Sequence, residues 1–326
     1  MKLNLAEIKS ITFGAVSIKE IDGSTEFNRF TDKQIECYYD KSYRGISLRG
    51  KMYHTSGIRF SFLTTSKRLK IEYVLECASG RNYAYFDVLE DGVLISHFGK
   101  EDIISEQNKI HSQEIEFKDG EKHVEVYFPW SVRTKIVGVE LDDFSLVIPK
   151  KREKTMISYG DSITQGYDAE YSSNTLCNRL SRYFNCDIYN KGVGGDTFSP
   201  KLLQLKEDIS PDIVTISYGS NDWFLLSKEE IIKNCNNFLQ SAFEIYKNSK
   251  IYITTPIWRA DYQKKKEITL KEIGELINQI SKDRKNVKVI TGWDLVPHSE
   301  DYFAPDGLHP NDKGFEEYFK NYINNI

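Results

Sequence analysis

The hydrophobic pattern of the chain changes near residue 150. Before this point, short segments alternate apolar and polar residues, as in GIRFSF (57–62), LKIEYVLE (69–76) and KHVEVYF (122–128). A period of two residues buries one face of a strand and exposes the other. Turn residues separate these segments, and EDG at 90–92 is expected to close a hairpin. Residues 1–150 are therefore predicted to form an all-β sandwich of the jelly-roll kind.

After residue 150, apolar strand segments alternate with amphipathic helical segments. The expected strands are 155–160, 187–190, 212–219, 250–256 and 287–292, and the expected helices lie near 172–184, 227–247, 264–283 and 311–325. This alternation predicts a parallel sheet covered by helices on both faces. Residues 151–326 are therefore assigned to a second domain of the α/β class, in which ligands bind where the strands end.

Composition excludes several classes of protein. The net charge of −4 gives no electrostatic case for nucleic acid, and no run reaches the roughly 18 apolar residues of a membrane span. The amino terminus lacks the apolar core of a signal peptide, so a cytoplasmic protein is expected. The five cysteines are an odd number without zinc-site spacing, and reduced thiols are expected.

A serine follows the first strand of the second domain in a tight turn. The stretch ISYGDSITQGY (157–167) sets Ser162 between Gly160 and Gly166. One interpretation is that Asp161 or Ser162 merely caps the next helix. The other is that Ser162 is a reactive group at the sheet edge, beside a helix amino terminus whose dipole favours negative charge.

Unusual polar residues also follow the other strands. The second strand is followed by NKGVGGDTF (190–198) and the third by YGSNDW, which contains Asn221. Near the carboxyl terminus, APDGLHPND holds Asp306 and His309 three residues apart. Each stretch by itself is compatible with a turn or a helix entry. Together, in order and at strand ends, they supply the groups that acyl transfer requires.

The chemistry assigns a role to each group. A serine hydroxyl such as that of Ser162 is a poor nucleophile unless a histidine takes its proton and a carboxylate holds that imidazole in one tautomer. His309 and Asp306 suit these two tasks. The oxyanion that develops during acyl transfer needs donors fixed in advance. The candidates are the N–H groups of Ser162 and Gly195 and the side-chain amide of Asn221.

The four stretches GDSIT, GVGGDT, GSND and DGLHP resemble the conserved blocks of the SGNH (GDSL-type) hydrolase superfamily, over residues 155–326. This resemblance implies a flavodoxin-like three-layer domain without metal or organic cofactor. It places the nucleophile on Ser162 and the acid and base on Asp306 and His309. The oxyanion-hole residues fall on Gly195 and Asn221.

Two neighbouring glycines compete for the same role in the second block. Gly195 is preferred to Gly194 because it directly precedes Asp196, as in the glycine–aspartate pair of the superfamily.

A second, looser resemblance narrows the substrate. A jelly-roll domain in front of this hydrolase fold is similar to carbohydrate esterases of the acetyl-xylan esterase kind. Trp223, Trp258 and Arg259 follow strand ends and are expected to bind the sugar, although each tryptophan is equally compatible with packing under a loop.

The function predicted from the sequence is a serine esterase that removes O-acetyl or other short acyl groups from small carbohydrates. One alternative is a lipid or thioester hydrolase of the same superfamily, and another is a catalytically silent carbohydrate-binding protein. Residues 1–150 are expected to select the substrate and to contribute little to bond cleavage. The sequence leaves the oligomeric state open.

Overall fold

The computed structural model describes residues 1–76, 78 and 80–326. The described chain divides into two compact units. We call the first the β unit; it consists of Met1–Thr31, Gly50–Glu153 and Tyr171–Ser173. The second, the α/β unit, consists of Asp32–Arg49, Lys154–Glu170 and Asn174–Ile326.

The expected division into residues 1–150 and 151–326 differs from the two units at two segments, because Asp32–Arg49 belongs to the α/β unit and Tyr171–Ser173 belongs to the β unit. The boundary near Glu153 is close to the expected one. The physical reason for the first difference is that Asp32–Arg49 buries Gln34 and Tyr38 in the α/β unit, where they bond to Glu207 and Asp196.

The β unit contains two antiparallel sheets. The first has the order β1-β6-β11-β8-β9 with β13 beside β6, and the second has the order β10-β7-β12-β3-β2. The strands of the first sheet are β1 (Thr12–Phe13), β6 (Arg59–Thr64), β8 (Ala84–Glu90), β9 (Val93–Lys100), β11 (Lys122–Tyr127) and β13 (Val147–Pro149). Those of the second are β2 (Ser17–Ile21), β3 (Ser24–Asn28), β7 (Arg68–Glu76), β10 (His111–Glu116) and β12 (Arg133–Leu141). Three short helices accompany them: α1 (Leu5–Ile11), α3 (Arg49–Met52) and α4 (Ile103–Glu106).

The two sheets enclose one apolar core, which confirms the predicted sandwich. Along β7, buried and partly exposed residues alternate, and the buried ones share a core with Phe60 and Phe62 of β6 and Val126 of β11. The expected hairpin at 90–92 joins β8 to β9 through Asp91 and Gly92, both with positive φ. This backbone matches the right-handed twist of the paired strands.

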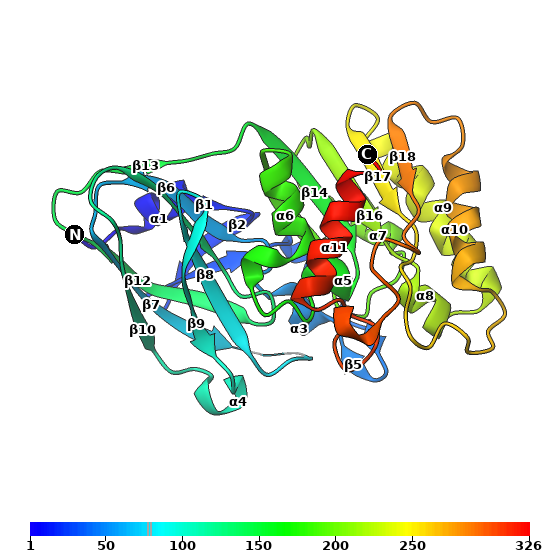
Figure 1. Cartoon of the computed structure of the whole chain (residues 1–326), viewed down its shortest axis with the longest axis horizontal. Coiled ribbons are helices and arrows are strands. Elements are labelled where there is room, and N and C mark those ends of the chain that lie inside the picture. The colour runs from blue at the N-terminus through cyan, green and yellow to red at the C-terminus, as the bar shows by residue number, and fades with distance from the viewer. Residues whose placement is uncertain (77, 79) are drawn as a thin grey trace. The chain divides into compact units, whose positions relative to one another are not determined.

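The α/β unit is built on a parallel sheet. Its order is β15-β14-β16-β17-β18, the order of flavodoxin-like folds. Strands β14, β16, β17 and β18 are labelled in Figure 1. The strands are β14 (Lys154–Gly160), β15 (Cys186–Gly192), β16 (Ile213–Ser217), β17 (Lys250–Thr254) and β18 (Val287–Ile290). The main helices are α6 (Leu176–Tyr183), α9 (Lys228–Ile245), α10 (Leu270–Ser281) and α11 (Asp312–Ile323). Shorter elements are α2 (Asp32–Glu36), β4 (Ser42–Tyr43), β5 (Ile46–Ser47), α5 (Ser162–Gln165), α7 (Pro200–Gln204), α8 (Ser220–Leu225) and the 3₁₀ turn Glu300–Tyr302. A second 3₁₀ turn, Ser172–Asn174, begins in the β unit and ends at the first residue of Asn174–Ile326.

Helices cover both faces of this sheet, as the sequence predicts. Met156 of β14 shares a core with α6 and α11, whereas the ring of Tyr159 packs against Phe238 of α9 on the other side. Helix α10 starts later than the expected 264, because Thr269 and Glu272 form a capping box at its amino terminus.

The carboxyl ends of three strands lie side by side. Gly160 at the end of β14 pairs with Gly192 of β15 and with Ser217 of β16. The loops that follow these strands, which carry the candidate site, therefore start from one edge of the sheet.

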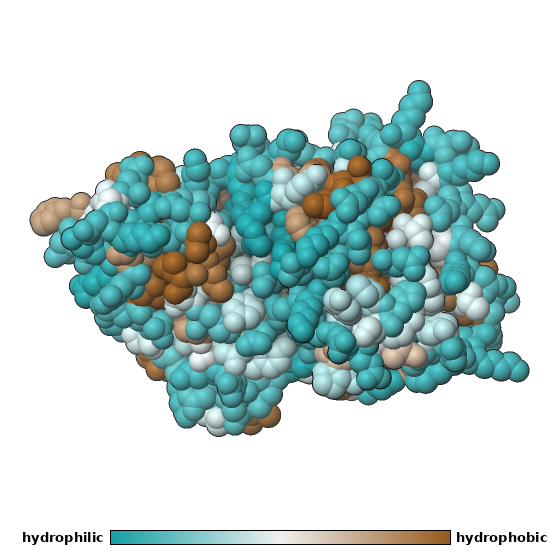
Figure 2. All heavy atoms as spheres, in the orientation of Figure 1, coloured by the Kyte–Doolittle hydropathy of each residue, from teal (hydrophilic) through white to brown (hydrophobic). Residues whose placement is uncertain are grey.

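On the face shown in Figure 2, hydrophilic residues predominate and apolar areas are separate. No helix in the described part of the chain is long and apolar enough to cross a membrane. Cys177, Cys186 and Cys235 are buried and Cys37 is half-buried, whereas Cys77 lies outside the described residues.

Candidate active site

The turn around Ser162 is tight because glycine makes it possible. Ser162 is the first residue of α5, and the side chain of Asp161 caps that helix by accepting a hydrogen bond of 3.0 Å from the Ile163 N–H. A Cβ atom on Gly160 would lie 2.0 Å from Oγ1 of Thr164. Only glycine therefore lets the strand turn back into the helix at this point.

The structure brings Ser162, His309 and Asp306 together in one hydrogen-bonded chain. Oγ of Ser162 lies 2.7 Å from Nε2 of His309, and Nδ1 of His309 lies 2.7 Å from Oδ2 of Asp306. Oδ1 of Asp306 accepts hydrogen bonds of 3.0 and 3.1 Å from the N–H groups of Leu308 and His309. This geometry fits an imidazole that carries its proton on Nδ1 and accepts one from the serine at Nε2.

The carboxyl group of Asp306 is held in its ionised form. Burial raises its pKa. The hydrogen bond from His309, the charge of His309 and the backbone N–H donors together outweigh burial and hold the pKa well below its usual range. Asp306 is therefore a carboxylate at neutral pH.

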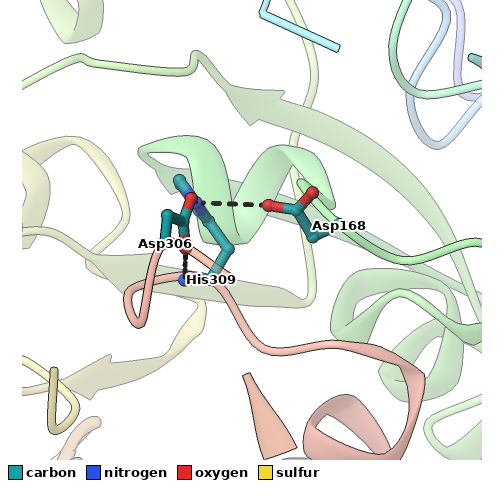
Figure 3. A group of neighbouring side chains, drawn as sticks. All are labelled: Asp168, Asp306 and His309. Atoms are coloured by element: carbon teal, nitrogen blue, oxygen red, sulfur yellow. Dashed lines mark hydrogen bonds and ion pairs between the residues drawn. The ribbon is translucent and has the colours of Figure 1, made fainter. Parts of the chain in front are cut away.

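A second carboxylate approaches the same nitrogen of His309 (Figure 3). Oδ2 of Asp168 lies 3.3 Å from Nδ1, and its side chain is 10% exposed compared with 36% for Asp306. Asp168 is not among the site residues predicted from the sequence. In the sequence, its only distinguishing feature is its place six residues after Ser162. In the structure, Asp168 lies in a turn and adopts a φ of 67°.

Asp168, Asp306 and His309 also form the one group of His, Cys, Asp and Glu side chains, within the described residues, that is close enough to hold a metal ion. An ion at this place would take the lone pair of Nδ1. The imidazole would then carry its proton on Nε2 and could not accept one from Ser162. The arrangement therefore suits a catalytic histidine better than a resident metal.

Two of the candidate oxyanion donors are distinguished by their partners. The Gly194 N–H donates to Oε1 of Gln165 at 2.8 Å. The Gly195 N–H makes no hydrogen bond to another group of the described chain. Gly195 is thus the donor that the geometry favours. It adopts a φ of +89°, and a Cβ there would lie 2.7 Å from Cβ of Tyr43.

Asn221 lies at the start of α8, after the end of β16. Its Nδ2 donates to the carbonyl oxygen of Asp196 at 2.9 Å. An amide carries two N–H bonds, so this contact fixes the side-chain orientation and leaves the second N–H as a donor.

Buried carboxyl groups surround these donors. Asp222 accepts hydrogen bonds from the N–H groups of Phe198 and Gly219 at 3.0 and 3.1 Å, which ties the loops after β15 and β16 together. Burial raises the pKa of Asp222 to about 7 and that of Asp161 to about 6.

Two of the three residues expected to bind sugar are buried. Trp223 is 1% exposed and Arg259 is 5% exposed, and the guanidinium lies 5.0 Å from the centre of the indole. Arg259 bonds to Asp261 and, at 3.1 Å, to Oγ of Ser220. Trp223 and Arg259 therefore pack against each other under the loop, and their contact with a substrate stays a prediction.

Trp258 has a different environment. It is half-buried, and its ring stacks on His298 with centroids 5.3 Å apart and planes inclined by 13°. It also contacts Phe303 at 5.1 Å. Of the three expected sugar-binding residues, Trp258 keeps an exposed surface.

Residues 158–316 match the GDSL-like Lipase/Acylhydrolase family. This part of the chain is a GDSL-like hydrolase domain. No curated protein sequence matches the chain.

Solved structures share the architecture of the hydrolase domain and the sandwich. A salicylyl-acyltransferase, SsfX3, from a tetracycline biosynthetic pathway has a TM-score of 0.82 at 21% identity, covering 96% of this chain and 93% of its own. A GDSL-like lipase from Bacteroides ovatus has a TM-score of 0.76 at 18% identity, covering 97% and 94%. A family two carbohydrate esterase from Clostridium thermocellum, in complex with cellohexaose, has a TM-score of 0.65 at 13% identity, covering 82% and 91%. At these identities the likeness concerns the fold.

Proposed function

We propose that the protein is a serine esterase that removes O-acetyl or other short acyl groups from carbohydrates. The observation that carries this proposal is the hydrogen-bonded chain from Ser162 through His309 to Asp306, with Ser162 directly beyond the end of β14 in the hydrolase domain. This arrangement matches the requirements of nucleophilic acyl transfer.

In the first half of the reaction, Oγ of Ser162 attacks the acyl carbonyl while Nε2 of His309 takes its proton. The carboxylate of Asp306 stabilises the imidazolium that forms. The oxyanion of the tetrahedral intermediate accepts hydrogen bonds from the Ser162 and Gly195 N–H groups and from Nδ2 of Asn221. The intermediate collapses to an acyl-enzyme, and His309 returns the proton to the departing sugar oxygen.

In the second half, water replaces the sugar. His309 takes a proton from the water as its oxygen attacks the acyl carbon, the same donors hold the second oxyanion, and the carboxylic acid leaves as the proton returns to Ser162. Groups of the chain supply every proton transfer and every hydrogen bond in both halves.

The carbohydrate part of the proposal has two supports. The two-unit fold is shared with a family two carbohydrate esterase that was solved with cellohexaose. Trp258 also offers a half-buried indole supported by His298. Aromatic faces of this kind suit the C–H faces of sugar rings.

Acyl transfer to an alcohol is the second candidate function. It is favoured by the fold shared with a salicylyl-acyltransferase over 96% of the chain. The same acyl-enzyme would then react with an acceptor hydroxyl in place of water. The two functions separate in one assay, in which an activated acetate ester is supplied with and without sugar acceptors and the acetylated sugar is measured beside free acetate.

A substrate screen tests the proposed esterase directly. Acetylated mono- and oligosaccharides are compared with long-chain nitrophenyl esters and thioesters, using wild type and Ser162→Ala. Acetate release from the sugars that depends on Ser162 supports the proposal. Preference for long-chain esters would indicate a lipid hydrolase, and failure of a fluorophosphonate to label Ser162 would indicate a silent binding protein.

A further inference from the structure

A segment far from the hydrolase domain in sequence belongs to the same compact unit. Residues 32–49 precede the family match at 158–316, yet they are part of the α/β unit. This segment contains α2 and the β4–β5 hairpin. The hairpin turns at Arg44 and Gly45, which have φ values of 50° and 80°.

The segment holds the side chain of Asp196 from two sides. The hydroxyl of Tyr38 donates to Oδ2 at 2.5 Å, and Nζ of Lys41 donates to Oδ1 at 3.0 Å. Lys41 also donates to Oγ of Ser199 at 2.6 Å. Tyr38 and Asp196 are 0% and 1% exposed. A buried carboxylate without hydrogen-bond donors or a positive charge beside it is strongly destabilising, so Asp196 depends on such partners.

Asp196 links the two oxyanion donors that lie outside α5. It directly follows Gly195, and its carbonyl oxygen accepts the hydrogen bond from Nδ2 of Asn221. The orientation of the Asn221 amide therefore depends on where the backbone of Asp196 lies. The Asp196 N–H donates to the carbonyl oxygen of Val193 at 3.0 Å, and the hydroxyl of Tyr218 lies 3.4 Å from Oδ2. The contacts of Tyr38 and Lys41 add to this support of the Asp196 backbone.

The same segment contacts Gly195 itself. Tyr43 and Leu48 lie against the side of Gly195 where a Cβ would be, at 2.7 and 3.2 Å from that position. The peptide that carries the Gly195 N–H is thus packed against the side chains of Tyr43 and Leu48.

We propose that Tyr38 and Lys41 are positioning residues for the oxyanion hole: by holding Asp196 they set the Gly195 N–H and the Asn221 amide. This inference rests on the proposed esterase mechanism. It also makes the catalytic unit discontinuous in sequence, so a fragment that starts near Lys151 lacks part of its oxyanion support. The expectation that residues 1–150 contribute little to bond cleavage then fails for residues 32–49.

The test uses the full chain and a small activated acetate ester, whose binding depends little on sugar contacts. Tyr38→Phe and Lys41→Met are each expected to lower kcat by about 10- to 100-fold, the value of one hydrogen bond to a charged group, with KM changed less than about threefold. Lys41→Arg keeps the positive charge and is expected to restore most of kcat. Tyr39→Phe is the matched control, since Tyr39 is the neighbouring tyrosine and is 69% exposed.

A double variant separates positioning from general damage. In the Asn221→Ala background, Tyr38→Phe is expected to lower kcat by a smaller factor than in wild type, because one of the two donors on which Tyr38 acts is absent. An equal loss in both backgrounds would mean that Tyr38 does not act through the Asn221 amide, and would overturn the inference that it sets both donors. So would kcat values within twofold of wild type for both Tyr38→Phe and Lys41→Met. If Tyr38→Phe does not fold, Lys41→Met at its partly exposed position carries the same comparison.

The proposed function has its own control in this series. Asn221→Ala alone is expected to lower kcat by about 10²- to 10³-fold. If that variant keeps wild-type kcat, the oxyanion assignment fails. If it loses activity while the segment variants do not, only the positioning role fails.

Discussion

The Asp306→Asn variant tests how far Asp168, the second carboxylate beside His309, can replace Asp306 in catalysis. In a triad with a single carboxylate, the equivalent change leaves the imidazole in the wrong tautomer and lowers kcat by about 10⁴-fold. Here Asp168 remains 3.3 Å from Nδ1. Because a carboxylate can only accept a hydrogen bond, Asp168 still favours the tautomer with the proton on Nδ1.

The distances give the expected size of the loss. With an effective dielectric constant of about 20, an imidazolium interacts with a carboxylate by about 6 kcal/mol at the 2.7 Å of Asp306 and by about 5 kcal/mol at the 3.3 Å of Asp168. The side chain of Asp306 is 36% exposed and is screened more by water, which brings the two values closer. The main loss is then one charge-assisted hydrogen bond, about 1.5–3 kcal/mol, or about 10- to 150-fold in kcat.

The assay is steady-state hydrolysis of an activated acetate ester by Asp306→Asn, Asp168→Asn and the double variant. The double variant is expected to lose about 10⁴-fold, since no carboxylate then faces Nδ1. Asp294→Asn, which changes an exposed carboxylate 3.5 Å from His298, is the matched control. A 10⁴-fold loss in Asp306→Asn alone, with wild-type activity in Asp168→Asn, would refute the reasoning.

Three further predictions concern the nucleophile, the buried acids and the sugar. Ser162→Ala is expected to remove nearly all esterase activity and to change the free energy of unfolding by less than about 1 kcal/mol, measured by urea denaturation; activity within tenfold of wild type would exclude the mechanism. The pKa of Asp222 is about 7 in the folded chain and that of Asp161 about 6, above the ordinary 3.8, so the folded state binds these protons more tightly. Their contribution to the free energy of unfolding is therefore full below pH 4, falls as the pH rises to about 7 and is constant above that pH. For Asp222 the total fall is on the order of 4 kcal/mol. The difference between wild type and Asp222→Asn in denaturation from pH 4 to 8 measures it, and a difference that stays constant would contradict it. Trp258→Ala is expected to raise KM for an acetylated oligosaccharide about tenfold and leave the small acetate ester unchanged; equal effects on both would remove Trp258 from sugar binding.

The sequence was sufficient for the features that depend on local pattern. Period-two segments predicted the sandwich, and the alternation of strands and helices predicted the parallel sheet. Because parallel strands end at one edge, Ser162, Asn221 and His309 could be expected to approach one another although 147 residues separate Ser162 from His309. These residues could be recognised because they are polar and stand in stretches that follow apolar strand segments.

The tertiary structure decided what has no local period. Asp168 lies in an irregular turn, and nothing in QGYDAEY shows that its carboxylate reaches Nδ1 of His309. Trp223 and Arg259 follow strand ends as a substrate-binding pair would, but the loop folds over them and buries both.

Residues 32–49 show the same limit most clearly. Their short elements have no periodicity that assigns them to either unit, and the partner of Tyr38 lies 158 residues away. The segment packs in the α/β unit, where Tyr38 donates a hydrogen bond to the buried carboxylate of Asp196 and Lys41 places a positive charge beside it. A carboxylate requires such partners only when it is buried, and Asp196 becomes buried only once the parallel sheet and its loops have formed.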